Sequence, residues 1–204
     1  MKIEAKPAHL WLGRQPYEPL WFRMRQQAAS IAEGADEVIW TCEHEAVYTT
    51  GRRGVDNRIG KTLPAPLLVT DRGGETTFHG PGQVMLYPHL HLRMRDLDVK
   101  AYVSVLEQSC IDLLAGFDVQ AQRKCGFPGV WLDDGKVAAL GVRVSKGVAY
   151  HGMALNVAVD GAWFSAIQPC GLPVPVVNLA SRGVSLPLPV IARHWYNALC
   201  RLIS

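Results

Sequence analysis

The chain has 204 residues, 49% of them hydrophobic, which is enough to bury a substantial core in one domain. Its formal net charge of +3 is too small to indicate a nucleic-acid partner, although it favours an acidic protein partner. No apolar run approaches the ~18 residues that a membrane helix needs, and the first residues lack the apolar core of a secretory signal. We therefore expect a cytoplasmic protein with no nucleic-acid or membrane partner.

The first half of the chain is predicted to contain one helix and three strands. The helix covers residues 17–33, where Leu20, Met24 and Ile31 recur near helical spacing before a glycine. The strands are expected over residues 37–43, 67–69 and 84–92. A glycine-rich run over residues 72–83 separates the last two strands.

The second half is predicted to contain two further helices with a hairpin series between them. The helices cover residues 99–117 and 189–203. Turns at residues 133–135 and 145–147 indicate antiparallel strands. These strands are expected over residues 129–132, 136–144 and 148–159. Strands and helices interleave without regular βαβ alternation, which predicts an α+β class with a mixed sheet in a single domain, residues 1–204.

The five cysteines are expected to be reduced thiols, because their number is odd and no export signal is evident. No two have C-x-x-C spacing, so we expect no metal site and interpret His89 and His91 as ordinary strand residues. Cys42, Cys110 and Cys200 lie on apolar strand or helix faces, and we predict that they are buried.

The run Arg72-Gly-Gly-Glu-Thr-Thr-Phe-His-Gly-Pro-Gly-Gln83 is the most informative local pattern. Glycine tolerates positive φ and lets backbone approach a ligand closely. The spacing matches neither the dinucleotide-binding fingerprint nor the phosphate-binding loop. A tight structural loop would explain the glycines alone. The interspersed donors Arg72, Thr77, His79 and Gln83 favour one wall of a ligand pocket.

Cys170 stands in a Pro-Cys-Gly turn, where a thiol can project from backbone whose N–H groups could stabilise an oxyanion. A buried structural thiol explains this position equally well. A cysteine attacks as its thiolate, and an ordinary pKa of ~8.5 calls for a nearby cation at neutral pH. Lys136, which starts an otherwise apolar strand, is the candidate, although a solvated hairpin lysine is the more common outcome. His79 and His151 are alternative bases.

The chain resembles the lipoyl(octanoyl) transferase family over nearly all of its length. The similar segments, in order, are residues 44–52, 72–83, 129–132, 136–143, 151–157 and 164–171. The resemblance implies the mixed α/β fold shared with lipoate-protein ligases and the catalytic domain of biotin protein ligases. It implies no nucleotide cofactor and no metal.

The same resemblance implies roles for particular residues. Cys170 would be the nucleophile that becomes an acyl thioester, and Lys136 would lower the pKa of its thiol. The implied substrate contacts, which line an acyl pocket, are Arg72, Gly73, Gly74, Glu75, Thr76, Thr77, Phe78, His79, Ala139, Leu140, Gly141, Gly152, Met153 and Ala154.

The implied reaction is the first step of protein lipoylation. An octanoyl group passes from octanoyl-acyl carrier protein through the cysteine to a specific lysine of a lipoyl domain. The implied acceptors are the lipoyl domains of 2-oxoacid dehydrogenases and the glycine cleavage H protein. Arg52, Arg53 and Arg58 are candidate docking contacts for these acidic proteins, beside the simpler interpretation as solvated loop charges. A non-catalytic binding module and a cysteine hydrolase of acyl thioesters remain alternatives.

Overall fold

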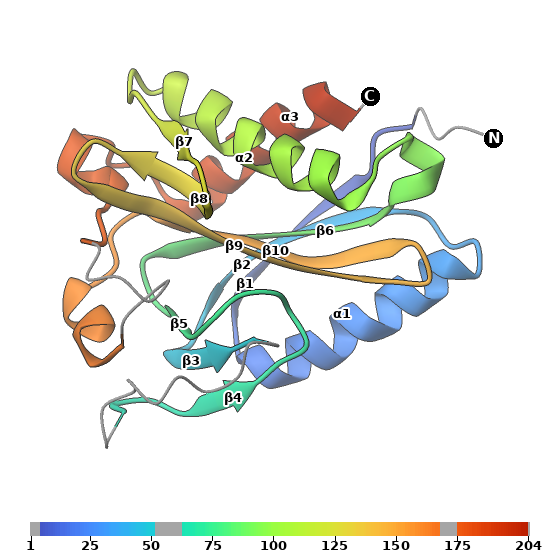
Figure 1. Cartoon of the computed structure of the whole chain (residues 1–204), viewed down its shortest axis with the longest axis horizontal. Helices are drawn as coiled ribbons and strands as arrows, with labels where there is room; N and C mark the ends of the chain where they lie inside the picture. Colours follow the sequence, from blue (N-terminus) through green and yellow to red (C-terminus); the bar gives the residue numbers. More distant parts are fainter. Residues whose placement is uncertain (1–4, 52–62, 168–174, 204) are drawn as a thin grey trace.

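The computed structural model describes residues 5–51, 63–167 and 175–203. Its centre is a seven-stranded mixed sheet (Figure 1). In order across the sheet the strands are β1 (Ala8–Gln15), β2 (Val38–His44), β6 (Gln83–His91), β10 (Val148–Asn156), β9 (Gly135–Ser145), β8 (Phe127–Leu132) and β7 (Gln122–Lys124). β1 and β2 are parallel, and every other neighbouring pair is antiparallel.

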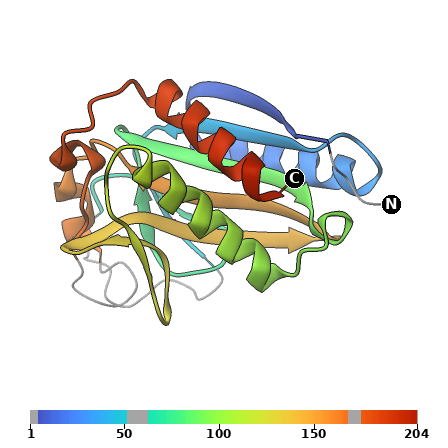
Figure 2. The ribbon, with the colours of Figure 1, turned by 90° about the horizontal axis from the view of Figure 1, so that it is seen from above.

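A second, three-stranded sheet lies on one side of the central sheet (Figure 1). It consists of β4 (Leu67–Val69), β3 (Val47–Thr50) and β5 (Thr77–His79). Helix α1 (Tyr17–Ala32) lies on the same side. Helices α2 (Val99–Ala115) and α3 (Leu188–Ile203) cover the opposite face, as the view from above shows (Figure 2). Short 3-10 helices are η1 (Leu92–Arg95), η2 (Gly161–Ala166) and η4 (Leu179–Arg182).

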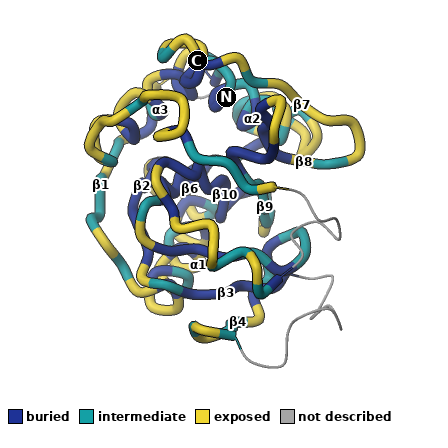
Figure 3. The backbone as a smooth tube through the Cα atoms, turned by 90° about the vertical axis from the view of Figure 1, so that its left-hand side faces the viewer, coloured by how far each residue is buried: buried dark blue, intermediate teal, exposed yellow. Residues whose placement is uncertain are grey.

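Two apolar clusters sandwich the central sheet. Alternate side chains of β6 and β10 point to opposite faces, so Leu86 and Leu155 join the cluster under α2 and α3. Met85 and Ala154 join the cluster under α1 instead. Strands β2, β6 and β10 form the most buried part of the sheet (Figure 3). The part of the sheet that faces β5 and the glycine-rich run lines a cavity, which is described below.

The predicted helices and the strands β2, β4, β6, β8, β9 and β10 are confirmed, as is the α+β class. Sequence reasoning missed β1, β3, β5 and β7. β1 is a half-exposed edge strand without clean alternation, and β7 has only exposed residues. β3 and β5 are short strands of the second sheet. Such segments are too short or too irregular for hydrophobic periodicity to identify them as strands. Pairing with distant strands decides their conformation.

The predicted burial of Cys42, Cys110 and Cys200 is confirmed, and Cys125 is exposed. Burial is the largest influence on the Cys42 and Cys110 thiols and raises the pKa of both. Among the described residues, no helix is long and apolar enough to cross a membrane. The predictions for Cys170 and for Arg52, Arg53 and Arg58 lie outside the described residues.

Candidate active site

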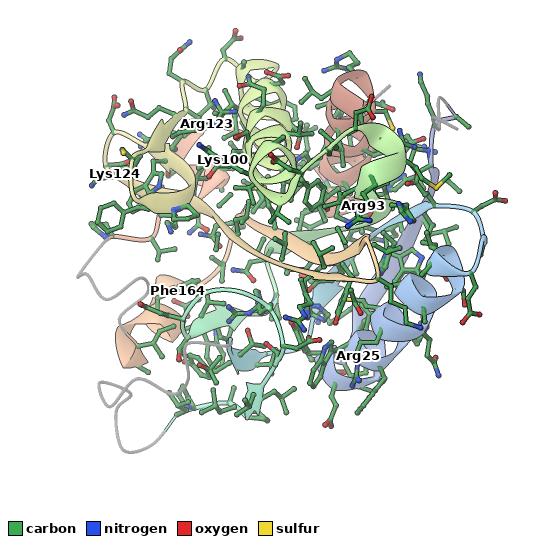
Figure 4. All side chains as sticks on the ribbon, turned by 45° about the vertical axis from the view of Figure 1, so that its right-hand side comes forward. Arg25, Arg93, Lys100, Arg123, Lys124 and Phe164 are labelled. Carbon is green, nitrogen blue, oxygen red and sulfur yellow. The ribbon has the colours of Figure 1, made fainter. Side chains whose placement is uncertain are left out.

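A cavity of about 430 Å³ lies between the central sheet and the glycine-rich run. Its volume falls within the ~300–1,000 Å³ typical of small-molecule sites. Strands β9 and β10 contribute small residues to its lining, namely Ala139, Gly141, Gly152 and Ala154. Pro128, which lines the cavity from β8, is exposed, so the cavity reaches the surface there. Phe164 of η2 also lines it and lies on the same side of the molecule as Lys124 (Figure 4).

The glycine-rich run forms the roof of this cavity. Residues Arg72–Thr77 and His79 line it, together with Gln83 at the end of the run. The Gly73 N–H donates to the Val142 carbonyl of β9 at 3.0 Å, which attaches the run to the sheet. A Cβ on Gly141 would lie 2.8 Å from the Gly73 carbonyl oxygen, so only glycine permits this approach. The run is therefore a wall of a pocket, as its residues indicated.

Arg72 holds the roof in shape through its guanidinium. Its Nη2 donates to the Thr49 carbonyl at 2.6 Å and to the Glu75 carbonyl at 2.9 Å. Its Nη1 donates to the Gly73 carbonyl at 2.9 Å, and both Nε and Nη2 reach Thr49 Oγ1. Because Arg72 is buried, these carbonyl oxygens cannot bind water, and the guanidinium supplies the hydrogen-bond donors that they need. This geometry gives Arg72 a structural task beside its place in the cavity lining.

Replacing Arg72 with lysine should lower the stability of the folded protein. An ammonium cannot reproduce the planar fork of the guanidinium, so buried carbonyls lose donors at a cost of about 2 kcal/mol. For a chain of this size the Tm should fall by about 4–8 °C. Differential scanning calorimetry measures this shift. Arg14→Lys is the matched control, because Arg14 is an exposed arginine paired with Glu43 and should leave the Tm nearly unchanged. An Arg72→Lys protein with the wild-type Tm would contradict the assignment.

Lys136 enters the cavity from the start of β9 and is only 7% exposed. Its Nζ donates to the Pro128 carbonyl at 2.9 Å and lies 4.7 Å from the centroid of the Trp131 ring. The exposed Lys124 reaches the same ring, with its Nζ 4.9 Å from the centroid. The hairpin-lysine interpretation is therefore wrong for Lys136, because its side chain is buried against β8 and lines the cavity.

A buried carboxylate supports the backbone around Lys136. Glu107 of α2 accepts a hydrogen bond from the Gly129 N–H at 2.8 Å, next to the carbonyl that binds Lys136. Gly129 has φ +120°, and a Cβ there would lie 2.4 Å from the Ala138 carbonyl oxygen. Only glycine accepts this conformation and this approach. The Gly-Val-Trp segment therefore positions the partners of Lys136.

The chain after Cys170 returns to Lys136. The Lys136 N–H donates to the Pro175 carbonyl at 3.0 Å, and the Val177 N–H donates to the Lys136 carbonyl at 3.2 Å. Val176 lines the cavity. Cys170 itself lies outside the described residues, but the described chain resumes five residues later beside Lys136.

The inner end of the cavity carries aromatic and imidazole groups that the sequence did not predict to lie together. Tyr17 and Tyr87 line it together with His79, and the Tyr17 ring stacks on His79 with centroids 5.6 Å apart. Behind them, the Tyr87 hydroxyl donates to His44 Nε2 at 2.8 Å. Burial is the main cause that lowers the pKa of His79 and the pKa of His44, the latter to about 4.

His151 takes part in a hydrogen-bond network centred on Asp71. Asp71 accepts from His151 Nε2 at 2.8 Å, from Trp21 Nε1 at 2.8 Å and from the Tyr150 hydroxyl. Burial opposes ionisation of Asp71, but these donors hold its pKa well below the ordinary range. Burial lowers the pKa of His151. His151 has φ +58°, a costly conformation that this network maintains.

The two histidines proposed as alternative bases both line the cavity. His151 pairs with Val142, six residues farther along β9 than Lys136, which corresponds to about 20 Å of strand. That separation disfavours His151 as the base for chemistry at Lys136. His79 lies on β5, where it stacks on Tyr17.

The implied substrate contacts occur together in the structure with one exception. All of them line the cavity except Phe78. Alternation in β5 turns Phe78 into an aromatic cluster with Tyr48 and Trp163, where its ring stacks on Trp163 at 4.8 Å. Met153 belongs to the apolar cluster under α2 and α3, against which Leu140 packs. The structure adds Met85, Tyr17, Tyr87, Asn156 and Phe127 to the lining.

Comparison with known proteins identifies the family. The model of the lipoyl protein ligase A/B catalytic domain matches residues 15–193. The chain belongs to this family. It is 42% identical to the octanoyltransferase of Aromatoleum aromaticum over 193 residues, which cover 94% of this chain and 84% of that protein. It is also 42% identical to the octanoyltransferase of Thiobacillus denitrificans over 206 residues, covering 100% and 94%. These relatives place the chain among the octanoyltransferases, which are acyltransferases.

Solved structures show the same fold at low sequence identity. One is a bipartite lipoate protein ligase, studied with its E2 lipoyl domain, from Thermoplasma acidophilum (TM-score 0.71, 15% identity, 97% of this chain and 84% of that chain). Another is the biotin protein ligase of Aquifex aeolicus in complex with biotin and ATP (TM-score 0.60, 12% identity, 96% and 70%). The predicted relation to the folds of these two ligase classes is confirmed.

Proposed function

We propose that this octanoyltransferase carries the octanoyl group as a thioester on Cys170, with octanoyl-acyl carrier protein as donor and a lysine of a lipoyl domain as acceptor. The observation that carries the proposal is the buried Lys136, which lines the cavity and binds the chain that follows Cys170 at Pro175. A lysine beside a thiol favours the thiolate. The similar octanoyltransferases support the acyl group that is transferred.

In the first half-reaction, the Cys170 thiolate attacks the carbonyl carbon of the donor thioester. The C–S bond to the carrier breaks, and the leaving thiolate takes a proton from the Lys136 ammonium. One thioester replaces another, so this step is nearly balanced in free energy. Preorganised N–H donors must stabilise the tetrahedral oxyanion, and we assign this role to backbone near Gly74 or Gly171. Gly74 lines the cavity with φ +94°, and Gly171 lies outside the described residues.

In the second half-reaction, the amine of the acceptor lysine attacks the acyl-enzyme. The amine loses a proton to Lys136, the C–S bond to Cys170 breaks, and an amide forms. Amide formation from a thioester runs downhill and gives the overall reaction its direction. The lipoyl domain as acceptor is supported by the ligase of similar fold that was studied with its E2 lipoyl domain. We extend the acceptors to other 2-oxoacid dehydrogenases and to the glycine cleavage H protein.

The proposal treats residues 1–204 as one octanoyltransferase catalytic domain that works in the cytoplasm. The family match over residues 15–193 and the single central sheet support one domain. The free thiols at Cys42, Cys110 and Cys125 support a reducing compartment.

Intact-mass spectrometry of the wild-type protein tests the proposal. Brief incubation with octanoyl-acyl carrier protein should add one octanoyl group, and peptide mapping should place it on Cys170. Addition of a lipoyl domain should discharge the adduct and transfer the same mass to that domain. Discharge to water alone would indicate a hydrolase. A lipoyl domain that gains octanoate without any adduct on the enzyme would overturn the covalent route.

A further inference from the structure

We propose that Met85 sets the length of the acyl chain that the cavity accepts. In this arrangement, which rests on the proposed function, the chain runs from Lys136 across β9 and β10 and ends against the Met85 side chain on β6. All of these residues line the cavity. Met85 is not among the substrate contacts that the family resemblance implies.

The floor of the cavity is a row of side chains in register across three strands. Ala154 of β10 pairs with Ala139 of β9 on one side and with Met85 of β6 on the other. Paired residues in neighbouring strands point to the same face of a sheet. The floor therefore has two small residues followed by a long one, and the long one closes it.

Met85 is held rigidly at the end of this row. It is 2% exposed and packs in the cluster under α1 with Leu20, Met24 and Cys42. Cys42, its partner on β2, is fully buried. Because this cluster is closely packed, Met85 cannot withdraw to admit a longer chain without displacing helix α1 residues.

The rows on either side of the alanine row are closed to an acyl chain. On one side, Gly141 and Gly152 are paired, but the Gly73 carbonyl oxygen lies 2.8 Å from the position that a Cβ on Gly141 would take. On the other side, the Gln83 side chain donates to Asn156 Oδ1 at 2.7 Å and bridges β6 and β10. An apolar chain is therefore confined to the row over Ala139 and Ala154.

The distance from Lys136 to Met85 matches an eight-carbon chain. Neighbouring strands lie ~4.8 Å apart, and Ala139 is three residues, about 10 Å, beyond Lys136 on β9, so the diagonal from the Lys136 Cα to the Met85 Cα is about 14 Å. The Lys136 side chain spans about 5 Å of this diagonal, and an extended chain of eight carbons, with C–C bonds of ~1.5 Å in a zigzag, spans the remaining ~9 Å. Two further methylenes would collide with Met85. A chain two methylenes shorter would leave the end of the row empty and lose their burial.

Competition between acyl donors tests the proposal. Equimolar hexanoyl-, octanoyl-, decanoyl- and dodecanoyl-acyl carrier protein are offered together, and the masses gained by the lipoyl domain give the ratios of kcat/KM. The wild type should prefer octanoyl. Met85→Ala should raise the decanoyl to octanoyl ratio by about 15-fold, the value of two buried methylenes. Ala154→Val, which fills the floor, should raise the hexanoyl to octanoyl ratio by a similar factor.

Leu106→Ala is the matched control. Leu106 of α2 is fully buried in the cluster on the opposite face of the sheet, away from Met85, and it does not line the cavity, so its loss should leave the ratios unchanged. A folded Met85→Ala protein with wild-type ratios would overturn the proposal. If Met85→Ala fails to fold, Ala154→Val decides alone, because it narrows the cavity without emptying the core. A wild type that transfers no acyl group would refute the proposed function itself, independently of these ratios.

Discussion

Replacing Lys136 with methionine should lower kcat/KM for octanoyl transfer by about 10³, because the buried cation that we propose to activate Cys170 and the proposed proton acceptor are both lost. Methionine keeps an unbranched stem of similar length, so the packing against Trp131 is largely preserved. The substitution removes the ammonium, which donates to the Pro128 carbonyl in the wild type. The measurements are transfer kinetics and the rate of Cys170 alkylation by iodoacetamide at neutral pH, both of which should fall.

Lys124→Met is the control for this prediction. Lys124 approaches the same Trp131 ring, but it is exposed and does not line the cavity, so its replacement should change kcat/KM less than twofold. The alkylation experiment is performed in a Cys125→Ser background, because Cys125 is exposed and would react as well. Cys170→Ala gives the baseline for complete loss. A Lys136→Met protein that keeps more than a tenth of wild-type activity would remove Lys136 from the mechanism.

His44 and His89 together should cost the folded protein about 4 kcal/mol of its unfolding free energy when the pH falls from 7 to 5, and His9, His79 and His151, whose pKa is also lowered by burial, add to this loss. Burial lowers the pKa of His44 to about 4 and the pKa of His89 to about 3, whereas both return to about 6.5 in the unfolded chain. Below pH 6.5 the unfolded state therefore binds more protons, and stability falls toward the folded pKa values. Each histidine contributes about 2 kcal/mol over this interval. Urea unfolding at a series of pH values measures the slope.

The surroundings of the two histidines explain why the neutral form is held. His44 lies between the Gln15 carbonyl, which accepts from Nδ1 at 2.9 Å, and the Tyr87 hydroxyl. A proton on Nε2 would face the hydroxyl donor. His89 packs against Trp40, with ring centroids 4.5 Å apart. His89→Phe should therefore fold and reduce the loss between pH 7 and 5 by about 2 kcal/mol, whereas His194→Phe, on an exposed position of α3, should leave the loss unchanged. Equal slopes for wild type and His89→Phe would refute this explanation.

The structure also separates two tasks among the residues that line the cavity. Arg72 uses its guanidinium on Thr49 and on backbone carbonyls of the run, so it builds the roof of the cavity. Small residues of β9 and β10 form the floor beneath it. The resemblance to the transferase family treats roof and floor alike as substrate contacts. The geometry predicts that Arg72 variants lose stability and that floor variants change the choice of acyl chain.

The sequence by itself determined the elements whose signals are local. Apolar residues at helical spacing defined α1, α2 and α3, and turn residues defined the hairpins of β8, β9 and β10. The glycine-rich run was recognised as a pocket wall because glycine conformation and close approach are encoded at single positions. Motif order identified the family and the candidate pair Cys170 and Lys136.

Only the tertiary structure decided which residues meet at the site. Met85 joins Ala139 and Ala154 through a register between strands that are far apart in the chain, and no local pattern specifies that register. Tyr17 reaches the cavity because α1 packs beside β6, and Phe78 leaves it because β5 pairs with β3. The burial of Lys136 depends on β8, on Glu107 of α2 and on the chain at Pro175. Periodicity is a property of neighbouring residues, whereas register and burial depend on distant segments, so the floor and inner end of the cavity emerge only in the fold.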